Sequence, residues 1–189
     1  MRIVITIITF VLTIAVAPAQ SHGICRLSSA SSGTTRHNPS KLGFCSRCFV
    51  RYHPFERAVC CIKFFEGLHQ AQDYPYIGYG HRIQPSEHFR LPLTRKQADA
   101  LLRRDLRKLC KMFRSYGKDS LLLATLAYNV GYGMLMGNAN HPKSRLIQKI
   151  ESGDRNIHND YIRFCRYKGK VVPSIRKRRK VELLLLYRK

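Results

Sequence analysis

Residues 64–69 read Phe-Phe-Glu-Gly-Leu-His, and residues 76–81 read Tyr-Ile-Gly-Tyr-Gly-His. Apolar residues recur at three- and four-residue steps from Phe55 to Phe65, which predicts a helix that Gly67 caps at its C-terminus. Glu66 therefore falls in the last turn, where the helix dipole disfavours a negative charge. That placement favours the protonated carboxyl group that a general acid requires.

The segment after Gly67 predicts a small β element followed by a long helix. Residues 74–83 alternate aromatic, aliphatic and glycine residues, as in a short strand or hairpin. Thr94 and Gln97 have the spacing of a capping box, and an apolar stripe follows them as far as Phe113. We expect this long helix to connect a small β lobe to a helical lobe.

The remaining segments predict a mostly helical lobe. Residues 121–130 are apolar on all sides, which indicates a buried core helix too short to span a membrane. Further helices are expected over residues 144–150, 157–164 and 174–187, the last with Ser174 as its N-cap. The predicted fold is α+β, with a helical lobe, one small sheet in a β-hairpin lobe, and a long joining helix.

The first residues are typical of a secretory signal. Arg2 precedes an apolar run that ends in Ala17-Pro18-Ala19, so residues 1–19 are expected to be a cleaved signal peptide rather than an uncleaved anchor. Residues 20–53 are expected to form a poorly ordered, cysteine-containing leader, and residues 54–189 the main domain. No other segment of the sequence is a candidate membrane span.

The chain is strongly basic. It has 34 Lys and Arg against 11 Asp and Glu, a net charge of +23, and removal of Arg2 with the signal leaves +22. A charge of this size indicates an anionic partner, with solubility alone as the plainer interpretation. Export argues against nucleic acid and for anionic polymers of a cell envelope.

The seven cysteines leave their chemistry open. They lie at positions 25, 45, 48, 60, 61, 110 and 165. Export makes disulfides plausible, and the odd count leaves at least one thiol over. Zinc is the less favoured alternative, because Cys60 and Cys61 are adjacent and lack zinc-ribbon spacing.

Six segments resemble the phage-type lysozymes, glycoside hydrolase family 24, and follow that family's order between about residues 54 and 187. They are Glu66-Gly67-Leu68, Ile77 to His81, residues 97–102, residues 122–131 with the start of the next helix at 144–147, and Arg178-Arg179-Lys180-Val181-Glu182. The form of residues 74–81 is closest to exported lysozyme-like proteins of Bacteroidota. The resemblance implies hydrolysis of the β-1,4 bond between N-acetylmuramic acid and N-acetylglucosamine in peptidoglycan, with Glu66 as the proton donor.

The second catalytic group departs from the family pattern. The family usually has an aspartate nine residues after the glutamate and a threonine before Ile-Gly, whereas this chain has Pro75 and Tyr76. Asp73 is the only carboxylate between Glu66 and Glu87. It is either the second catalytic residue, reached through a shortened loop, or a turn residue. A second group is needed to stabilise the oxocarbenium ion and to hold a water or act as nucleophile.

Five further residues are candidate substrate-binding residues, each with a plainer alternative. They are His69 (or a cleft wall), Tyr76 and Tyr79 (or aromatic packing), His81 (or a structural hydrogen bond) and Asn129 (or a satisfied buried amide). In the basic run of residues 176–180, Arg178 and Arg179 are expected to be structural and the others to supply surface charge.

Three functions fit these features. The first is an exported muramidase acting on peptidoglycan, without cofactor or metal. The second is a non-catalytic cationic protein that binds the envelope, and the third is a metal-dependent hydrolase using Glu66, His69 and His81. The first accounts for the most residues. We expect a monomer that binds peptidoglycan and anionic envelope polymers, with no nucleic acid and no stable membrane span.

Overall fold

The computed structural model describes residues 52–188. The expected signal peptide at residues 1–19, almost all of the leader and the cysteines at 25, 45 and 48 lie outside the described residues. No helix within residues 52–188 is both long enough and apolar enough to cross a membrane.

Helix α3 (Pro54–Glu66) ends where the sequence predicts. Pro54 occupies the first turn, where its missing N–H costs nothing. The Gly67 N–H donates to the Lys63 carbonyl at 3.0 Å, and Gly67 has φ 70°, a conformation that favours glycine. Ala58, Val59, Cys61 and Ile62 form the buried side of α3, which leaves Glu66 as its last residue.

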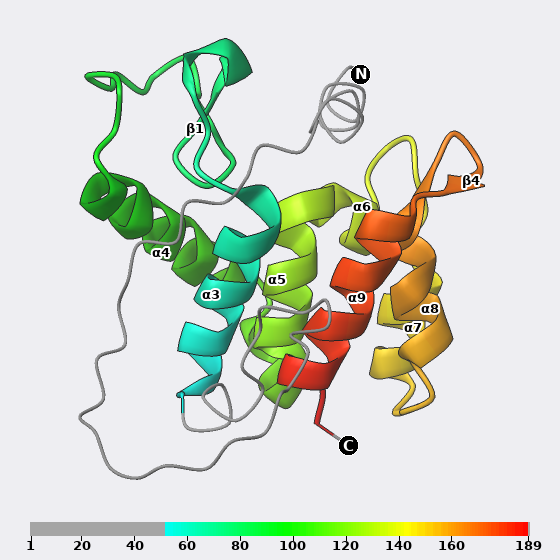
Figure 1. Cartoon of the computed structure of the whole chain (residues 1–189). Coiled ribbons are helices and arrows are strands. Elements are labelled where there is room, and N and C mark those ends of the chain that lie inside the picture. Colours follow the sequence, from blue (N-terminus) through cyan, green and yellow to red (C-terminus); the bar gives the residue numbers. More distant parts are fainter. Residues whose placement is uncertain (1–51, 189) are drawn as a thin grey trace, which may run out of the picture. The chain divides into compact units, whose positions relative to one another are not determined.

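A small β lobe follows α3 (Figure 1). It contains a short 3₁₀ turn, η2 (Ala71–Asp73), and the antiparallel strands β1 (Tyr76–Ile77) and β2 (His81–Arg82). Ile77 pairs with His81, so residues 78–80 form the connecting loop. Gly78 and Gly80 have φ values of 59° and 96°, which explains why both positions are glycine.

Helix α4 (Arg95–Met112) leads from the β lobe to the helical lobe, as expected for the connector (Figure 1). The Thr94 hydroxyl accepts from the Gln97 N–H at 3.2 Å, and the Gln97 side chain accepts from the Thr94 N–H at 2.9 Å. This reciprocal pair is the predicted capping box. The buried side of α4 consists of Ala98, Leu101, Leu102 and Leu106.

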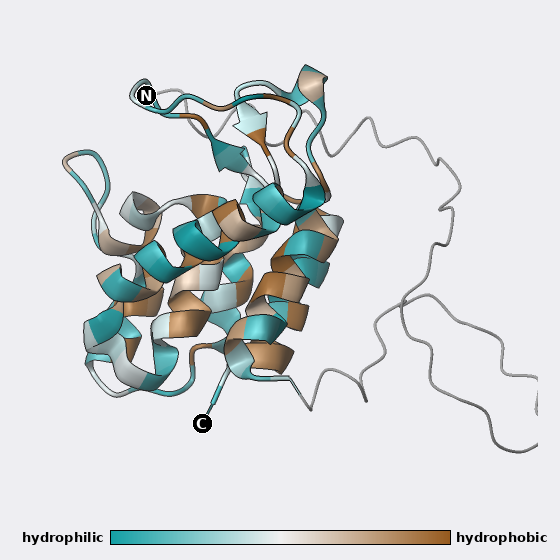
Figure 2. Ribbon diagram, turned by 90° about the vertical axis from the view of Figure 1, so that its left-hand side faces the viewer, coloured by the Kyte–Doolittle hydropathy of each residue, from teal (hydrophilic) through white to brown (hydrophobic). Residues whose placement is uncertain are grey.

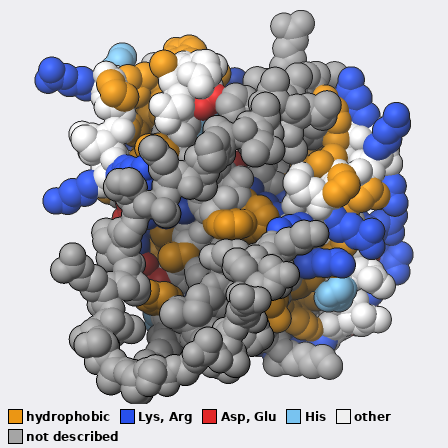
Figure 3. Space-filling view, in the orientation of Figure 1, with side chains coloured by type: hydrophobic (Ala, Val, Ile, Leu, Met, Phe, Trp, Pro, Cys, Tyr) orange, Lys and Arg blue, Asp and Glu red, His pale blue; other side chains and the backbone are white. Residues whose placement is uncertain are grey.

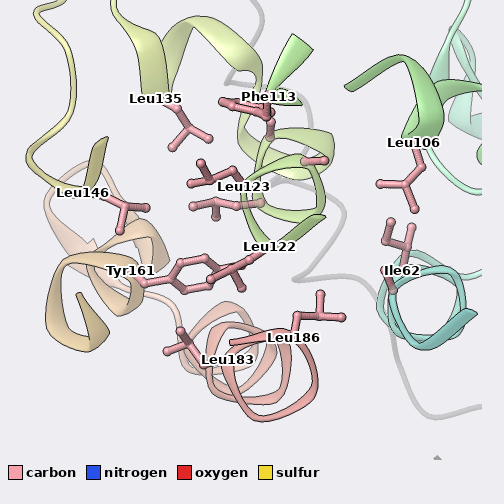
Figure 4. Close-up of a cluster of buried hydrophobic side chains, with 14 of the residues drawn as sticks. Ile62, Leu106, Phe113, Leu122, Leu123, Leu135, Leu146, Tyr161, Leu183 and Leu186 are labelled. Carbon is pink, nitrogen blue, oxygen red and sulfur yellow. The ribbon is translucent and has the colours of Figure 1, made fainter. Parts of the chain in front are cut away.

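The helical lobe surrounds one buried helix, α5 (Ser120–Val130), which packs against α3, α4 and α9. Its other elements are η3 (Arg114–Asp119), α6 (Tyr132–Met136), α7 (Arg145–Glu151), α8 (His158–Ile162), η4 (Arg163–Cys165) and α9 (Pro173–Leu186). The apolar sides of these helices face one another and their polar sides face outward (Figure 2). Figure 4 shows Leu122 and Leu123 of α5 among side chains from several helices, with Ile62 facing Leu106.

Two predictions about the C-terminal part are wrong. A second two-stranded sheet, β3 (Arg166–Tyr167) and β4 (Lys170–Val171), adds to the one expected. Its two-residue turn has positive φ at Lys168 and Gly169, as a type I′ hairpin turn requires. Helix α9 starts at Pro173 and its N-cap residue is Val172, because proline fits the first helical position; Ser174 is inside the first turn. The predicted α+β class, mostly helical with a small hairpin lobe and a long connecting helix, is nevertheless confirmed.

Candidate active site

The candidate site is centred on the carboxylate of Glu66 at the C-terminal end of α3. Its side chain is 15% exposed, so it is largely enclosed yet reaches solvent. The glycine loop of the β lobe lies directly beside it: a Cβ atom placed on Gly80 would be 3.5 Å from Glu66 Cδ. Glu66 therefore lies where the β lobe meets the helical lobe.

Two side chains from the helical lobe hold one oxygen of this carboxylate. Arg178 of α9 donates from Nη1 to Glu66 Oε1 at 2.6 Å, and Asn129 of α5 donates from Nδ2 to the same oxygen at 3.4 Å. The Arg178 guanidinium also lies 5.7 Å from the centre of the Phe65 ring. Among residues 52–188 these are the hydrogen bonds that Glu66 accepts, and they leave Oε2 on the side of Gly80.

A buried carboxylate, Glu182, supports the two arginines of α9. It is fully buried and accepts from Arg178 Nε at 2.8 Å, from Arg179 Nη1 at 2.7 Å and from the Tyr161 hydroxyl at 2.9 Å. Arg179 in turn donates to the side-chain oxygen of Asn129. Burial opposes the charge on Arg178, but Glu66 and Glu182 outweigh it and hold the pKa of Arg178 above its ordinary value.

The sequence predicts structural roles for Arg178 and Arg179. Arg179 is buried in the network as described, but Arg178 also contacts Glu66 directly, and sequence reasoning missed that contact. The two residues are 112 positions apart, so no local spacing could have revealed it. The Arg-Arg-x-x-Glu pattern of residues 178–182 indicates only the local pair, because it puts Arg178 and Glu182 one helical turn apart.

The carboxylate of Asp73 is engaged in the turn that precedes β1. Its Oδ2 accepts from the Gln70 N–H at 2.7 Å, and its side chain is 5% exposed. His69 Nδ1 lies 3.7 Å from the same oxygen, beyond hydrogen-bond distance. Of the two roles that the sequence left open, this geometry favours that of a turn residue with a histidine beside it.

His69 lies against the β hairpin. Its N–H donates to the Gly78 carbonyl at 2.8 Å, and its ring centre is 6.2 Å from that of Tyr76. The side chain is 14% exposed. The backbone bond ties His69 to the same glycine loop that contacts Glu66, so His69 and Glu66 border one region.

His81 joins the β lobe to the connector helix. Nδ1 lies 2.6 Å from Asp105 of α4, and Nε2 lies 2.8 Å from Glu87. Both ring nitrogens are thus engaged by carboxylates, which favours the structural interpretation of this residue over substrate binding. Burial lowers the affinity of His81 for a proton, but Asp105 and Glu87 outweigh burial and the pKa of His81 is raised.

The tyrosines of the hairpin differ in their surroundings. The Tyr79 carbonyl accepts from the Tyr128 hydroxyl of α5 at 2.9 Å, and Lys63 Nζ lies 5.2 Å from the centre of the Tyr79 ring. Tyr76 is half-buried in β1. The sequence indicates no role for Tyr128, yet its hydrogen bond connects the glycine loop to α5 in the core.

The described cysteines carry no disulfide. Cys60, Cys61, Cys110 and Cys165 are all thiols, and burial raises the pKa of Cys61 to about 12. Within residues 52–188, no group of three or more His, Cys, Asp or Glu side chains is arranged to hold a metal ion.

The enclosed carboxylate of Glu66 lies between a glycine-rich hairpin and a helical lobe. The sequence profile of the Phage lysozyme family matches residues 63–182, which include the helix end at Glu66, the hairpin, α4, α5 and the Arg178–Glu182 segment. The chain therefore belongs to the phage lysozyme family, whose activity is the hydrolysis of peptidoglycan. No curated protein matches the sequence at a significant level.

Proposed function

We propose that this protein is an exported muramidase that cleaves the β-1,4 bond between N-acetylmuramic acid and N-acetylglucosamine, with Glu66 as general acid. The observation that supports it is the enclosed Glu66 carboxylate, whose Oε1 is held by Arg178 while Oε2 lies beside Gly80. The proton passes from Glu66 to the glycosidic oxygen as the bond from that oxygen to the sugar carbon breaks. A water then adds to the resulting oxocarbenium ion, releases a proton and completes hydrolysis.

For the second catalytic role we propose His69 as the group that takes the proton from the water, with the turn residue Asp73 beside it as its positioning residue. The two side chains lie 3.7 Å apart at the base of the hairpin, and the His69 backbone is bonded to the glycine loop. Asp73 would favour the positive charge that His69 acquires on taking a proton from the water. Tyr76, Tyr79 and Asn129 are proposed to contact the sugar chain, and His81 to hold the hairpin in place.

The decisive experiment measures release of reducing ends from purified murein. Glu66→Gln removes the acid and should lower the rate by about 10²-fold or more while murein binding persists. Glu151→Gln is the matched control, because Glu151 is an exposed carboxylate paired with Lys143 on the helical lobe. A Glu66→Gln protein with wild-type activity would refute the proposed role of Glu66.

Asp73→Asn and His69→Gln test the second role separately. Loss of activity in both, with murein binding retained, supports the pair. Asp73 Oδ2 also accepts a hydrogen bond from the Gln70 N–H in the turn, so Asp73→Asn could lose activity because the protein is less stable. A lowered melting temperature of Asp73→Asn would identify that cause.

The alternative function is that of a non-catalytic cationic protein of the envelope. That protein would retain its antibacterial effect in the Glu66→Gln variant and lose it at high salt, because exposed charges are screened.

A further inference from the structure

Exposed basic residues are concentrated in the C-terminal part of the chain. Between Asp160 and Glu182 the sequence contains no carboxylate. Its exposed cations, here called the C-terminal basic face, are Arg163, Arg166, Lys168, Lys170, Arg176, Lys177 and Lys180.

These cations form one surface because their elements are in contact. Strands β3 and β4 pair with each other, and η4 packs against α9. The Val172 N–H donates to the Cys165 carbonyl at 2.8 Å, which joins the end of the hairpin to η4. Figure 3 shows Lys and Arg side chains along the right-hand edge, the side on which Figure 1 has β4, α8 and α9.

The molecule does not neutralise this face internally. Among the described residues, no carboxylate forms an ion pair with any of the seven cations. The two acidic residues that border the run are buried and already paired: Asp160 with Lys149, and Glu182 with the two buried arginines. By contrast, Lys63 and Arg103 are both paired with Asp99.

The chemistry of the face indicates a polyanion rather than a lipid bilayer. Leu183 and Leu186 of α9 are buried in the core, and the exposed apolar side chains of β4 and α9 are Val171 and Leu184, too few to form the apolar stripe of a helix that inserts into a bilayer. Its outward side carries Arg176, Lys177 and Lys180, which lie one to four positions apart and therefore present closely spaced charges. A flexible chain with a negative charge on each repeat can meet several of them at once and release its counterions.

A phosphodiester keeps its charge over a wider pH range than a carboxylate does. The three arginines among the seven cations can bind either group through their planar fork. Carboxylates lose their charge below about pH 4, whereas a phosphodiester stays ionised there, so a phosphodiester polymer would stay bound in acid.

We propose that the C-terminal basic face binds a phosphodiester-linked polymer of the bacterial cell wall, of the teichoic acid class, and holds the enzyme at the wall independently of catalysis. The wall as the place of encounter rests on the proposed function; the binding itself does not. Attachment through this face would raise the local concentration of the enzyme at its substrate.

The test is a binding titration of the purified protein with poly(glycerol phosphate), carried out in the Glu66→Gln background so that hydrolysis plays no part. The face variant is Lys170→Gln, Lys177→Gln and Lys180→Gln together. The control is Lys96→Gln, Lys108→Gln and Lys111→Gln, three exposed lysines of α4 that remove the same charge elsewhere. Poly-glutamate, duplex DNA and phosphatidylglycerol vesicles are the competing probes.

The face variant is expected to bind poly(glycerol phosphate) about tenfold or more weakly at 0.15 M salt, with a plot of log affinity against log salt that is less steep by about 2. The control variant should stay within about twofold of the parent protein. Equal losses in the two variants would show that only net charge matters and would overturn the proposal. Tighter binding to any of the three competing probes would overturn the choice of partner. Loss of murein hydrolysis in wild type with polymer binding intact would refute the proposed function alone.

Discussion

The guanidinium of Arg178 lies 2.6 Å from the carboxylate of Glu66 and also donates to Glu182 at 2.8 Å. One arginine therefore connects the candidate general acid at the end of α3 to a fully buried carboxylate in α9. Because Arg178 is itself buried, its charge is balanced only by these two carboxylates among the described residues, and its position determines that of Glu66.

Replacing Arg178 should affect both stability and activity. Arg178→Gln leaves two largely enclosed carboxylates short of a partner, and breaking such a buried pair costs about 3–5 kcal/mol. Arg178→Lys keeps the charge but loses the second N–H fork, so it should unfold at higher urea than Arg178→Gln yet release reducing ends more slowly than wild type. Full activity in Arg178→Lys would mean that Arg178 supplies charge without orienting Glu66.

Glu182 should be the most sensitive carboxylate of the helical lobe. Glu182→Gln leaves Arg179 without a charged partner inside the core, with an expected loss of about 3–5 kcal/mol in the free energy of unfolding. Glu151→Gln, at an exposed pair with Lys143, should have a much smaller effect, because exposed ion pairs are screened by solvent. Urea unfolding of the two variants makes the comparison, and similar losses in both would contradict the central role of Glu182.

Gly80 should matter for conformation and for catalysis together. Its φ of 96° disfavours any L side chain, so Gly80→Ala should cost about 1–2 kcal/mol. The added Cβ would also lie 3.5 Å from Glu66 Cδ, on the side of Oε2, where we propose that the substrate binds. Gly153→Ala is the matched control, because Gly153 has φ 78° and nothing within 4 Å of the added atom. Stability should fall in both variants, whereas the rate of murein hydrolysis should fall only in Gly80→Ala.

The attachment of the β lobe through His81 should depend on pH. Although burial opposes protonation, Asp105 and Glu87 raise the pKa of His81 above its usual value near 6.5. A raised pKa in the folded protein means that the stabilisation is complete below about pH 6.5 and is lost as the pH rises through the folded value. The difference in melting temperature between wild type and His81→Gln should therefore shrink above neutral pH.

Protonation of Glu87 in acid should weaken the same contact between the β lobe and α4. The Gln84 N–H, followed by His81 and Arg104, lowers the pKa of Glu87 to about 2. A lowered pKa contributes stability above the usual value of 4.5, and this contribution is lost as the pH falls from there towards 2. Glu87→Gln should reduce the pH dependence of stability in this window, as followed by circular dichroism. An unchanged pH dependence would show that it comes from other carboxylates.

Much of the fold follows from local sequence. The end of α3 at Gly67, the capping box at Thr94 and the buried character of α5 each depend on residues within one or two helical turns. The hairpin of β3 and β4 was missed, because its turn places Lys168, a residue without turn preference, at positive φ beside Gly169. Pro173 was placed before α9 for a similar reason, since proline marks a boundary without showing on which side of it the helix starts.

The sequence by itself determined the helix that ends at Glu66, the glycine loop after it and the order of segments that marks the family, because each depends on periodicity, capping or backbone freedom over a few residues. Only the tertiary structure decided what surrounds those residues. Packing of α9 against α3 brings Arg178 to Glu66, and packing of the β lobe on α4 brings Asp105 to His81. Whether a carboxylate is enclosed, paired or free depends on neighbours that are distant in the chain. The local sequence does not indicate which residues these are.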